Sequence, residues 1–337
     1  MMNKDAIVCD VGTSSLKLGY SSDRAPREVI SSVIGRSQTK AGSNDYICGN
    51  QALKQRRELQ CSYPIEGGVV RKWDDMELLL DHAIGKLDNN QNSESRILIT
   101  EPPLNPIDNK SKMLETMFES MNFGAVNVSN QAVLVLYAQG LLSGMVIDCG
   151  EGVTQIVPVY EGFVPHHLIK RHPIVGQKIT SYLSSLLQLR SNSKFTSDLE
   201  TVKDIKETLC YAAHDLDEER RLARETTVLV ENYTLPDGTS VKVGRERFEC
   251  TEAYFDPSLI DMECKGLSDF VFDTIQECDV STRKHFYEHM VLSGGSSMFP
   301  GMPNRLHKDI QNRYLKDILQ GDETRLKKCK INVEAPR

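Results

Sequence analysis

Residues 6–13 read Ala-Ile-Val-Cys-Asp-Val-Gly-Thr, and residues 144–154 read Gly-Met-Val-Ile-Asp-Cys-Gly-Glu-Gly-Val-Thr. Each stretch is an apolar run that ends in an aspartate, one further residue and a glycine. This pattern predicts a strand, a tight glycine turn and a second strand in both places. The two aspartates, Asp10 and Asp148, lie 138 positions apart (148 minus 10), close to half of the chain. The sequence therefore predicts a duplicated α/β unit with a cleft between its halves.

Length and composition narrow the class of protein. The 337 residues suggest two domains at about 150 residues each. Forty Lys and Arg against 47 Asp and Glu leave a net charge of −7, which argues against a protein that binds nucleic acid by neutralising phosphates. The nine cysteines lack CxxC spacing and predict buried thiols in a reducing compartment. With no signal peptide and no apolar run of about 18 residues, we expect a cytoplasmic protein without membrane insertion.

Apolar spacing predicts individual elements. The run from Ala132 to Ile147 predicts a buried helix followed by a buried strand. Pro236-Asp237-Gly238 predicts a hairpin that joins residues 227–235 to residues 239–243. A methionine-rich stripe on one helical face is expected to pack in a core, and it comprises Met113, Leu114, Met117, Phe118 and Met121.

The two glycine turns have the composition of a phosphate site. Glycine lets backbone N–H groups approach phosphate oxygens, while Thr13 and Ser14 add hydroxyl donors and Lys17 adds a positive charge. Asp10 and Asp148 would repel phosphate unless they shared a divalent cation with it. Mg²⁺ binds through one or two carboxylates plus phosphate oxygens. A single aspartate of this kind would more simply cap its own turn, but two copies at mirrored positions favour a magnesium–polyphosphate site.

A third glycine turn follows a predicted strand late in the chain. Residues 291–301 read Val-Leu-Ser-Gly-Gly-Ser-Ser-Met-Phe-Pro-Gly. The backbone at this turn suits a nucleoside, with Met298 and Phe299 as a platform for the base. A Gly-Gly turn alone is weak support, because ordinary turns use it most often.

Several longer stretches resemble actins and actin-related proteins. They are residues 63–77 (Tyr-Pro-Ile-Glu-Gly-Gly-Val-Val-Arg-Lys-Trp-Asp-Asp-Met-Glu), 98–110 (Leu-Ile-Thr-Glu-Pro-Pro-Leu-Asn-Pro-Ile-Asp-Asn-Lys), 131–137 (Gln-Ala-Val-Leu-Val-Leu-Tyr), 205–211 (Ile-Lys-Glu-Thr-Leu-Cys-Tyr) and 291–301. The similarity runs in the family's order from Ala6 to Arg337. It implies an α/β, actin-like ATPase fold, in which two lobes of duplicated sheet-and-helix units surround a nucleotide cleft.

The resemblance also implies domains, cofactors and site residues. The first lobe would cover residues 1–138, with its smaller subdomain at about 32–64, and the second 139–337, with its smaller subdomain at about 175–255. ATP and Mg²⁺ would be the cofactors, with Asp10 and Asp148 holding Mg²⁺ through water. The implied nucleotide-binding residues are Gly12, Thr13, Ser14, Lys17, Gly150, Glu151, Gly152, Val153, Lys206, Glu207, Gly294, Gly295, Ser296, Met298 and Phe299.

Gln131 and Gln155 are the implied catalytic residues. Gln131 would orient the attacking water, with Gln155 near it. Apart from the resemblance, Gln131 would more simply make a helix-terminal hydrogen bond. The implied activity is at most a slow ATP hydrolysis.

Within the family, residues 137–142, 225–238 and 313–322 most resemble one subunit of the seven-subunit complex that nucleates branched actin filaments. The resemblance implies an ATP-binding subunit that mimics a filament end together with a second actin-related protein. The implied partners are that protein, the other subunits, actin and nucleation-promoting factors. The implied location is the cytoplasmic cytoskeleton, in the actin-rich cortex or in cell projections.

Four departures from the family pattern bear on these expectations. Ser14 replaces a glycine and costs about 1 kcal/mol if the backbone there is left-handed. Gln155 replaces a histidine near the water and Glu151 replaces an aspartate, which affects hydrolysis more than binding. The shortened loop at residues 39–45 disfavours homopolymerisation. Family members also continue several tens of residues beyond Arg337, and we expect the shorter chain to leave apolar surface of the first lobe uncovered.

Other functions fit the residues less well or stay open. A sugar kinase or a chaperone-type ATPase shares the fold, but a kinase needs a general base, usually Asp, and Gln131 is a poor base. A zinc hydrolase at His285 and His289 lacks the adjacent Glu of the HExxH helix. A divergent actin-related protein with other partners, or a non-hydrolysing nucleotide switch, stays open.

Overall fold

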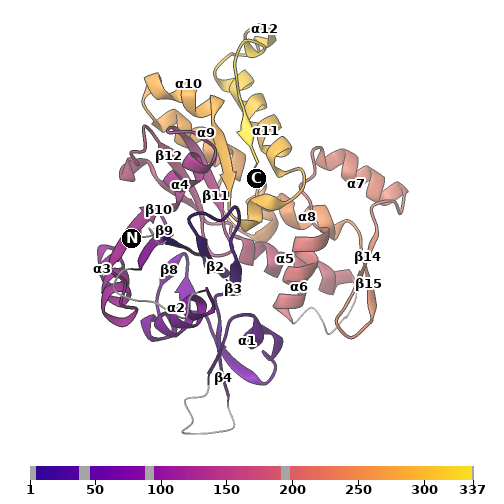
Figure 1. The fold of residues 1–337 in the computed structure, drawn as a ribbon. Helices are drawn as coiled ribbons and strands as arrows, with labels where there is room; N and C mark the ends of the chain where they lie inside the picture. The colour runs from indigo at the N-terminus through magenta and orange to yellow at the C-terminus, as the bar shows by residue number, and fades with distance from the viewer. Residues whose placement is uncertain (1–4, 38–45, 88–94, 191–197, 336–337) are drawn as a thin grey trace. The chain divides into compact units, whose positions relative to one another are not determined.

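The computed structural model describes residues 5–37, 46–87, 95–190 and 198–335. The chain divides into two compact units, Met1–Leu134 and Val135–Arg337, each with its own hydrophobic core (Figure 1). The division expected after residue 138 lies four positions (138 minus 134) from this boundary. The loop expected at residues 39–45 lies outside the described residues. Within the described ranges, no helix combines the length and the apolar composition needed to cross a membrane.

A five-stranded sheet forms the centre of the first unit. Its order is β10-β9-β1-β2-β3, with bounds Ala125–Asn130, Arg96–Glu101, Ile7–Val11, Ser15–Tyr20 and Glu28–Ser31. β1 runs parallel to β9, and β9 parallel to β10, whereas β2 is antiparallel to both β1 and β3. On β2 the buried Leu16 and Leu18 alternate with the exposed Lys17, because successive side chains of a strand point to opposite faces.

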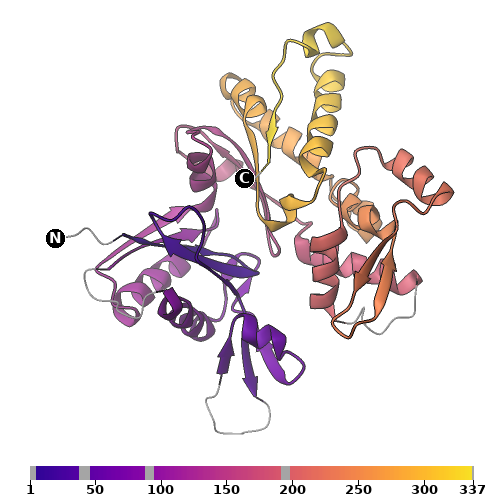
Figure 2. The same cartoon turned by 45° about the vertical axis from the view of Figure 1, so that its right-hand side comes forward.

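Smaller elements complete the first unit. The helices are α1 (Asn50–Lys54), α2 (Trp73–Leu87), α3 (Ile107–Glu115), the π-helix η1 (Thr116–Ser120) and α4 (Gln131–Ala138), which crosses the division between the units. A three-stranded sheet has the order β5-β4-β6, with bounds Tyr46–Cys48, Ile34–Ser37 and Leu59–Ser62, and β7 (Ile65–Glu66) pairs with β8 (Val69–Val70). Figures 1 and 2 show the three-stranded sheet and α1 at one end of the unit.

The methionine stripe lies where α3 continues into η1. Met113, Met117 and Met121 are buried in the core of the first unit, which confirms the prediction for these residues. Phe118 is 46% exposed, so its assignment to the buried face is wrong. A π-helix closes i→i+5 hydrogen bonds and has more residues per turn than an α-helix. Side chains in η1 therefore drift off the face that α-helical spacing predicts.

The second unit repeats the sheet of the first. Its order is β13-β12-β11-β16-β17, with bounds Lys170–His172, Thr154–Val159, Gly144–Cys149, Met290–Ser293 and Val333–Glu334. The hairpin β11–β12 is antiparallel and continues antiparallel to β13, while β16 is parallel to β11 and β17 to β16. Strand order and directions match those of β3-β2-β1-β9-β10. The predicted duplication of an α/β unit is confirmed.

Helices make up most of the rest of the second unit. They are α5 (Gly176–Arg190), α6 (Leu199–Leu209), α7 (Leu216–Glu225), α8 (Glu246–Glu252), α9 (Leu267–Glu277), α10 (Val280–Glu288), α11 (Met302–Asp317) and α12 (Glu323–Leu326), with short 3₁₀ segments η2 (His166–Leu168), η4 (Pro257–Ile260) and η5 (Gly295–Met298). The hairpin β14 (Glu231–Thr234) to β15 (Ser240–Val243) turns at Gly238 with φ +84°, as Pro236-Asp237-Gly238 predicts. The first strand is shorter than the predicted 227–235, because residues 227–230 form a turn in which the Val230 N–H donates to Thr227 O.

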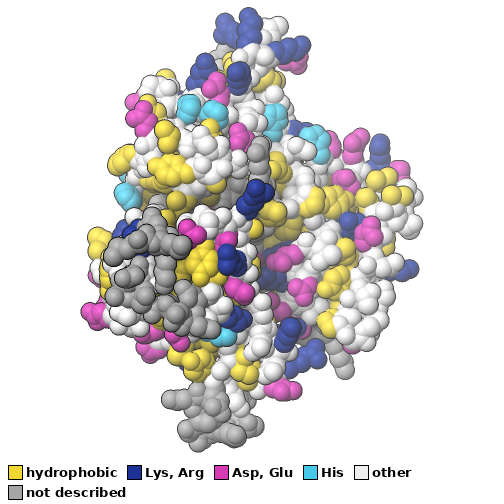
Figure 3. Space-filling view, in the orientation of Figure 1, with side chains coloured by type: hydrophobic (Ala, Val, Ile, Leu, Met, Phe, Trp, Pro, Cys, Tyr) yellow, Lys and Arg dark blue, Asp and Glu magenta, His cyan; other side chains and the backbone are white. Residues whose placement is uncertain are grey.

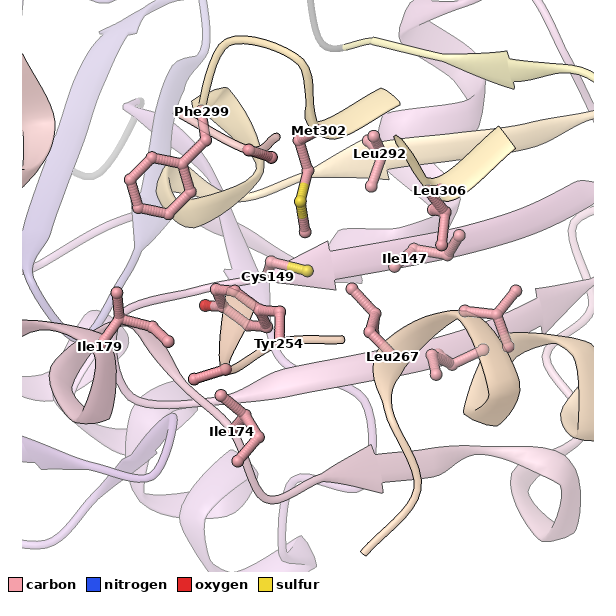
Figure 4. Close-up of a cluster of buried hydrophobic side chains, with 14 of the residues drawn as sticks. Ile147, Cys149, Ile174, Ile179, Tyr254, Leu267, Leu292, Phe299, Met302 and Leu306 are labelled. Carbon is pink, nitrogen blue, oxygen red and sulfur yellow. The ribbon is translucent and has the colours of Figure 1, made fainter. Parts of the chain in front are cut away.

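The core of the second unit lies between its sheet and these helices. Ile147 and Cys149 of β11 pack with Leu292 of β16 and with Met302 and Leu306 of α11 (Figure 4). The predicted helix and buried strand over residues 132–147 are confirmed as α4 and β11, but the helix is only partly buried, since Ala132 and Leu136 are buried and Tyr137 is 51% exposed. All nine cysteines are free, six of them buried and three partly buried.

Candidate functional site

Three strand ends bring polar side chains together in the first unit. Asp10 lies near the end of β1, Thr100 near the end of β9, and Gln131 directly after β10 at the start of α4. Asp10 Oδ1 accepts hydrogen bonds from Thr100 Oγ1 (2.7 Å) and from Gln131 Nε2 (3.1 Å). The three strands are parallel, so their carboxyl ends share one edge. Ligands of open α/β sheets bind at that edge.

The amide of Gln131 is oriented by this network. Its Nε2 lies 3.2 Å from both Val11 O and Thr100 Oγ1. The Val11 N–H in turn donates to Thr100 Oγ1 (3.0 Å), which fixes the hydroxyl as a donor to Asp10. With its nitrogen turned toward Asp10, Gln131 presents its amide oxygen as the end that can accept a hydrogen bond from water.

Lys17 and the Gly12 turn complete the site in the first unit. Lys17 Nζ pairs with Asp10 Oδ2 at 3.2 Å, with the two side chains 47% and 34% exposed. An exposed pair of this kind contributes little to stability, so the ammonium can move to a stronger anion. The Gly12 N–H donates to Ser15 O (3.2 Å), and a Cβ on Gly12 would lie 2.8 Å from that oxygen. Ser14 does not have a positive φ, so the expected cost of serine there does not arise.

The hairpin β11–β12 of the second unit repeats the strand register and the turn contacts of β1–β2. Asp148 stands opposite Gln155 in the register of β11 and β12, as Asp10 stands opposite Lys17. The Gly150 N–H donates to Val153 O (2.8 Å), and a Cβ on Gly150 would lie 2.8 Å from this oxygen. Close backbone approach therefore requires glycine at both turns.

The third glycine turn packs directly on Asp148. Ser293 of β16 is the register partner of Asp148, and Gly294 follows with φ +85°. A Cβ at Gly294 would lie 2.8 Å from Asp148 Oδ1 and would overlap the Cys149 carbonyl. Two of the predicted glycine turns therefore meet at one carboxylate in the second unit.

Lys206 joins α6 to the Gly150 loop and to α5. Its Nζ lies 3.1 Å from both Glu151 Oε2 and Gly176 O, and the side chain is only 2% exposed. The first N–H groups of α5 donate to the same loop, Gly176 N to Gly150 O and Gln177 N to Glu151 O, each at 3.0 Å. Lys206 and Glu151, both predicted as nucleotide ligands, thus form an ion pair with each other, in which Lys206 is buried and Glu151 is 21% exposed.

The remaining predicted residues of the second unit differ in exposure. Gln155 is fully buried, and Ser296 is buried with its Oγ donating to Gly150 O (3.3 Å). Met298 is 63% exposed, whereas Phe299 is 6% exposed and packs in the core (Figure 4). Of the two residues predicted as a base platform, only Met298 is therefore presented to solvent. Glu207 is exposed overall, yet desolvation by neighbouring atoms raises the pKa of its carboxyl despite the lysines beside it.

An actin family model matches residues 1–337, the whole chain. The chain belongs to the actin family. It is 47% identical over 344 residues to Actin-related protein 2 of Arabidopsis thaliana, covering 100% of this chain and 88% of that protein. It is 47% identical over 348 residues to Actin-related protein 2 of Drosophila melanogaster (99% and 87%) and 46% identical over 344 residues to Actin-related protein 2 of Oryza sativa subsp. indica (100% and 88%).

Two polar contacts of this actin-family site were not predicted from the sequence. Thr100 lies inside the stretch that resembles actins, yet its role depends on β9 being the neighbour of β1, which periodicity does not reveal. The Gly176 carbonyl, which accepts from Lys206, lies 30 residues away in sequence. A buried lysine on a predicted amphipathic helix signals that an acceptor must exist, but not which one.

Proposed function

We propose that this chain binds ATP with Mg²⁺ through its two glycine hairpins and the aspartates that precede them. The observation that carries the proposal is the repetition of one arrangement in both units. In each, an aspartate is the penultimate residue of a central strand, and a glycine two residues later closes the turn with its N–H. Membership of the actin family supports this assignment.

The residues present fit a magnesium–phosphate group. Asp10 and Asp148 would hold Mg²⁺ through water, and the bound cation would neutralise phosphate charge beside the carboxylates. The turns lack a Cβ at Gly12 and Gly150, where one would fall 2.8 Å from a carbonyl oxygen, so the backbone can approach phosphate closely. Lys17 would exchange its exposed pairing with Asp10 for a phosphate oxygen.

The nucleoside would be bound by residues of the second unit. Glu207 and Met298 are exposed and can contact a ligand. Lys206 is held by Glu151 and Gly176, and Phe299 lies in the core, so these two would support the pocket from behind. Gly294, Gly295 and Ser296 would present backbone to the ligand.

Substitution of the aspartates tests nucleotide binding. Asp10→Ala and Asp148→Ala should each lower the affinity for Mg-ATP by about 10–100-fold, because each removes a carboxylate that holds the cation through water. The measurement is a titration with a fluorescent ATP analogue in the presence of Mg²⁺. Asp81→Ala, an exposed aspartate on α2, is the matched control and should bind as the parent does. Unchanged affinity in both test variants would sink the proposal.

Gln131 would orient the attacking water with its amide oxygen, because its nitrogen is held by Asp10 and Val11. Gln155 is fully buried and would act as a positioning residue beside Asp148. Gln131→Ala should slow phosphate release, measured in single turnover, while the affinity for Mg-ATP stays the same. A variant that releases phosphate at the parent rate would exclude this role.

We further propose that the chain is the ATP-binding subunit of a seven-subunit complex that nucleates branched actin filaments in the cytoplasmic cytoskeleton. Similarity to proteins named Actin-related protein 2 over essentially the whole chain supports this. The partners would be a second actin-related protein, the other subunits, actin and nucleation-promoting factors. The test is affinity purification of this chain at its native expression level, with the co-purifying proteins quantified by mass spectrometry. We expect the second actin-related protein and five further subunits in near-equal amounts. Recovery alone or with an unrelated set would reject the assignment.

A non-hydrolysing nucleotide switch, or a divergent actin-related protein with other partners, is the second candidate. The complete burial of Gln155 favours a switch without hydrolysis, because the side chain is then not placed to contact a water. A measurement of phosphate release distinguishes a chain that hydrolyses ATP from a switch that does not. Binding of Mg-ATP without any release of phosphate over many hours would support the switch.

A further inference from the structure

Two histidines and a glutamate converge at the carboxyl end of α10. One ligand atom each of His285, Glu288 and His289 lies within 4.8 Å of the other two. The imidazole rings are 4.8 Å apart between centroids, since residues i and i+4 of a helix share a face. Figure 3 shows histidine side chains gathered at the surface near α10 of Figure 1. Imidazole and carboxylate are the donors that zinc sites combine.

The backbone beneath this cluster is held from two sides. The His289 N–H donates to His285 O (3.1 Å), which continues the last turn of the helix. The Met145 N–H of β11 donates to His289 O (2.8 Å), and Met290 pairs with Val333 of β17. The ligands therefore stand on backbone that both α10 and the sheet restrain, which lowers the entropy cost of arranging them around an ion.

The charges around the cluster favour a cation. His289 Nδ1 is buried and has no hydrogen-bond partner among the described residues. Glu334 Oε1 of β17 lies 4.0 Å from this nitrogen, too far for a hydrogen bond but close enough to add negative charge. The cluster also sits at a helix carboxyl terminus, where the helix dipole attracts positive charge.

The geometry needs only a small adjustment to bind metal. Ligand bonds of about 2.0–2.1 Å place tetrahedral ligand atoms about 3.3 Å apart. The three atoms lie within 4.8 Å of one another. Side-chain rotations that move each ligand atom by on the order of 1 Å therefore bring them to the tetrahedral spacing. All three residues are partly exposed, which leaves the ion accessible and a fourth position open to water.

We propose that His285, Glu288 and His289 form a Zn²⁺ site that fixes the carboxyl end of α10. The site leaves its fourth coordination position to water and is independent of nucleotide binding. The two histidines have the i,i+4 spacing of the HExxH zinc motif, but Glu288 precedes the second histidine and serves here as a ligand, not as a catalytic base.

Metal titration of the full chain tests this site. The parent should bind one Co²⁺ per chain with the visible d–d bands of a tetrahedral ion, and Zn²⁺ should displace it. His285→Gln and Glu288→Gln should each weaken Zn²⁺ binding by at least about 10-fold, because loss of a partner outside the ligand shell already costs about 10–100-fold and each change removes a ligand itself. Zn²⁺ should also raise the Tm of the parent more than that of His285→Gln.

The control is His167→Gln, which removes an exposed histidine outside the cluster. This variant should keep the parent's Zn²⁺ affinity, its stoichiometry and its Co²⁺ bands. The comparison distinguishes metal binding by any exposed histidine from binding by His285, Glu288 and His289. Equal Zn²⁺ affinity in the parent, His285→Gln and Glu288→Gln would overturn the proposal, as would an octahedral Co²⁺ spectrum in the parent. Far-ultraviolet circular dichroism of the metal-free variants shows whether they fold, and folding is expected because His285 and Glu288 are both partly exposed.

Discussion

Gly294 has φ +85° and ψ 156°, a combination that residues with a Cβ essentially do not adopt. The strand β16 ends at Ser293, beside Asp148, and the chain must turn there without touching β11. A Cβ would fall 2.6 Å from the Cys149 carbonyl carbon and 2.8 Å from Asp148 Oδ1. Both the backbone angle and the space therefore require glycine.

Gly294→Ala should lower the free energy of unfolding by about 1–3 kcal/mol from backbone strain alone, and further through the overlap with β11. Urea denaturation measures this change. Gly295→Ala is the matched control, because a Cβ there meets nothing within 4 Å and its φ is not positive. Equal stabilities of the two variants would contradict the account of Gly294.

His172 is buried in its neutral form. Its Nδ1 accepts from the Ile174 N–H (3.3 Å), so the proton lies on Nε2, which donates to Lys265 O (3.0 Å). Burial lowers the pKa of the imidazole, and the charge of Lys178 lowers it further. As pH falls, the unfolded chain therefore takes up a proton at His172 before the folded chain does.

The lowered pKa of His172 makes the free energy of unfolding depend on pH. The contribution of neutral His172 to this free energy should be complete above the unfolded-state pKa of about 6.5. It should be lost as pH falls from there toward the folded-state pKa. His172→Gln should consequently show a smaller drop in the free energy of unfolding between about pH 7.5 and about pH 5.5 than the parent. The exposed His167, changed to Gln, should leave the full drop. An identical pH dependence in His172→Gln and the parent would refute this assignment.

At the scale of elements, one arginine ties α8 to α11. Arg305 of α11 donates to both oxygens of Glu252 at the end of α8, at 2.8 and 2.7 Å, and it also bonds Asp309 and the Ala213 carbonyl. The side chains of Arg305 and Glu252 are 13% and 5% exposed. Burial raises the pKa of Glu252, and Arg305 opposes this effect. Each charge is therefore tolerated because the other is present.

Arg305→Met should destabilise the chain by about 3–5 kcal/mol, because it leaves a buried carboxylate without its partner. The double variant Arg305→Met, Glu252→Leu should recover most of this loss, since two apolar groups replace the pair. Arg325→Ala, which removes a 74% exposed partner of Asp322, should change stability by less than about 0.5 kcal/mol. The measurement is the urea midpoint of the parent and of the three variants. A double variant that is no more stable than Arg305→Met would contradict this account.

At the scale of the whole molecule, the two units have separate hydrophobic cores. The buried cluster of the first unit draws on residues 7–123 and that of the second on residues 145–310. The one tryptophan of the chain, Trp73, packs against the first cluster. Its fluorescence therefore reports the unfolding of the first unit, while far-ultraviolet circular dichroism reports both units.

Leu79→Ala, in the first core, should cost about 2–5 kcal/mol and lower the urea midpoint of Trp73 fluorescence by about 1 M or more. Ile275→Ala, in the second core, should leave that midpoint in place and shift only part of the dichroism transition. Leu79 and Ile275 are both fully buried, so the variants are matched. A shift of the Trp73 midpoint in Ile275→Ala equal to that in Leu79→Ala would show that the two cores unfold as one.

The sequence by itself determined the local structure and the family. Alternation and glycine turns predicted both hairpins, the spacing of Met113, Met117 and Met121 predicted a buried helical face, and longer stretches indicated the actin family. These signals are local, because strand alternation, turn chemistry and helical periodicity each extend over a few residues. The exposure of Phe118 escaped prediction, because a π-helix changes the periodicity on which the prediction depends.

Only the tertiary structure decided which polar groups meet. Gln131 reaches Asp10 across 121 residues, and Lys206 reaches Glu151 across 55. Each contact depends on strand order and helix packing, which bring distant segments to one edge of a sheet. The same holds for Phe299, which lies in the core instead of at the surface, and for His289, whose neighbour Glu334 comes from the distant strand β17. Side-chain type sets what a residue can do, but burial and neighbours select among those possibilities.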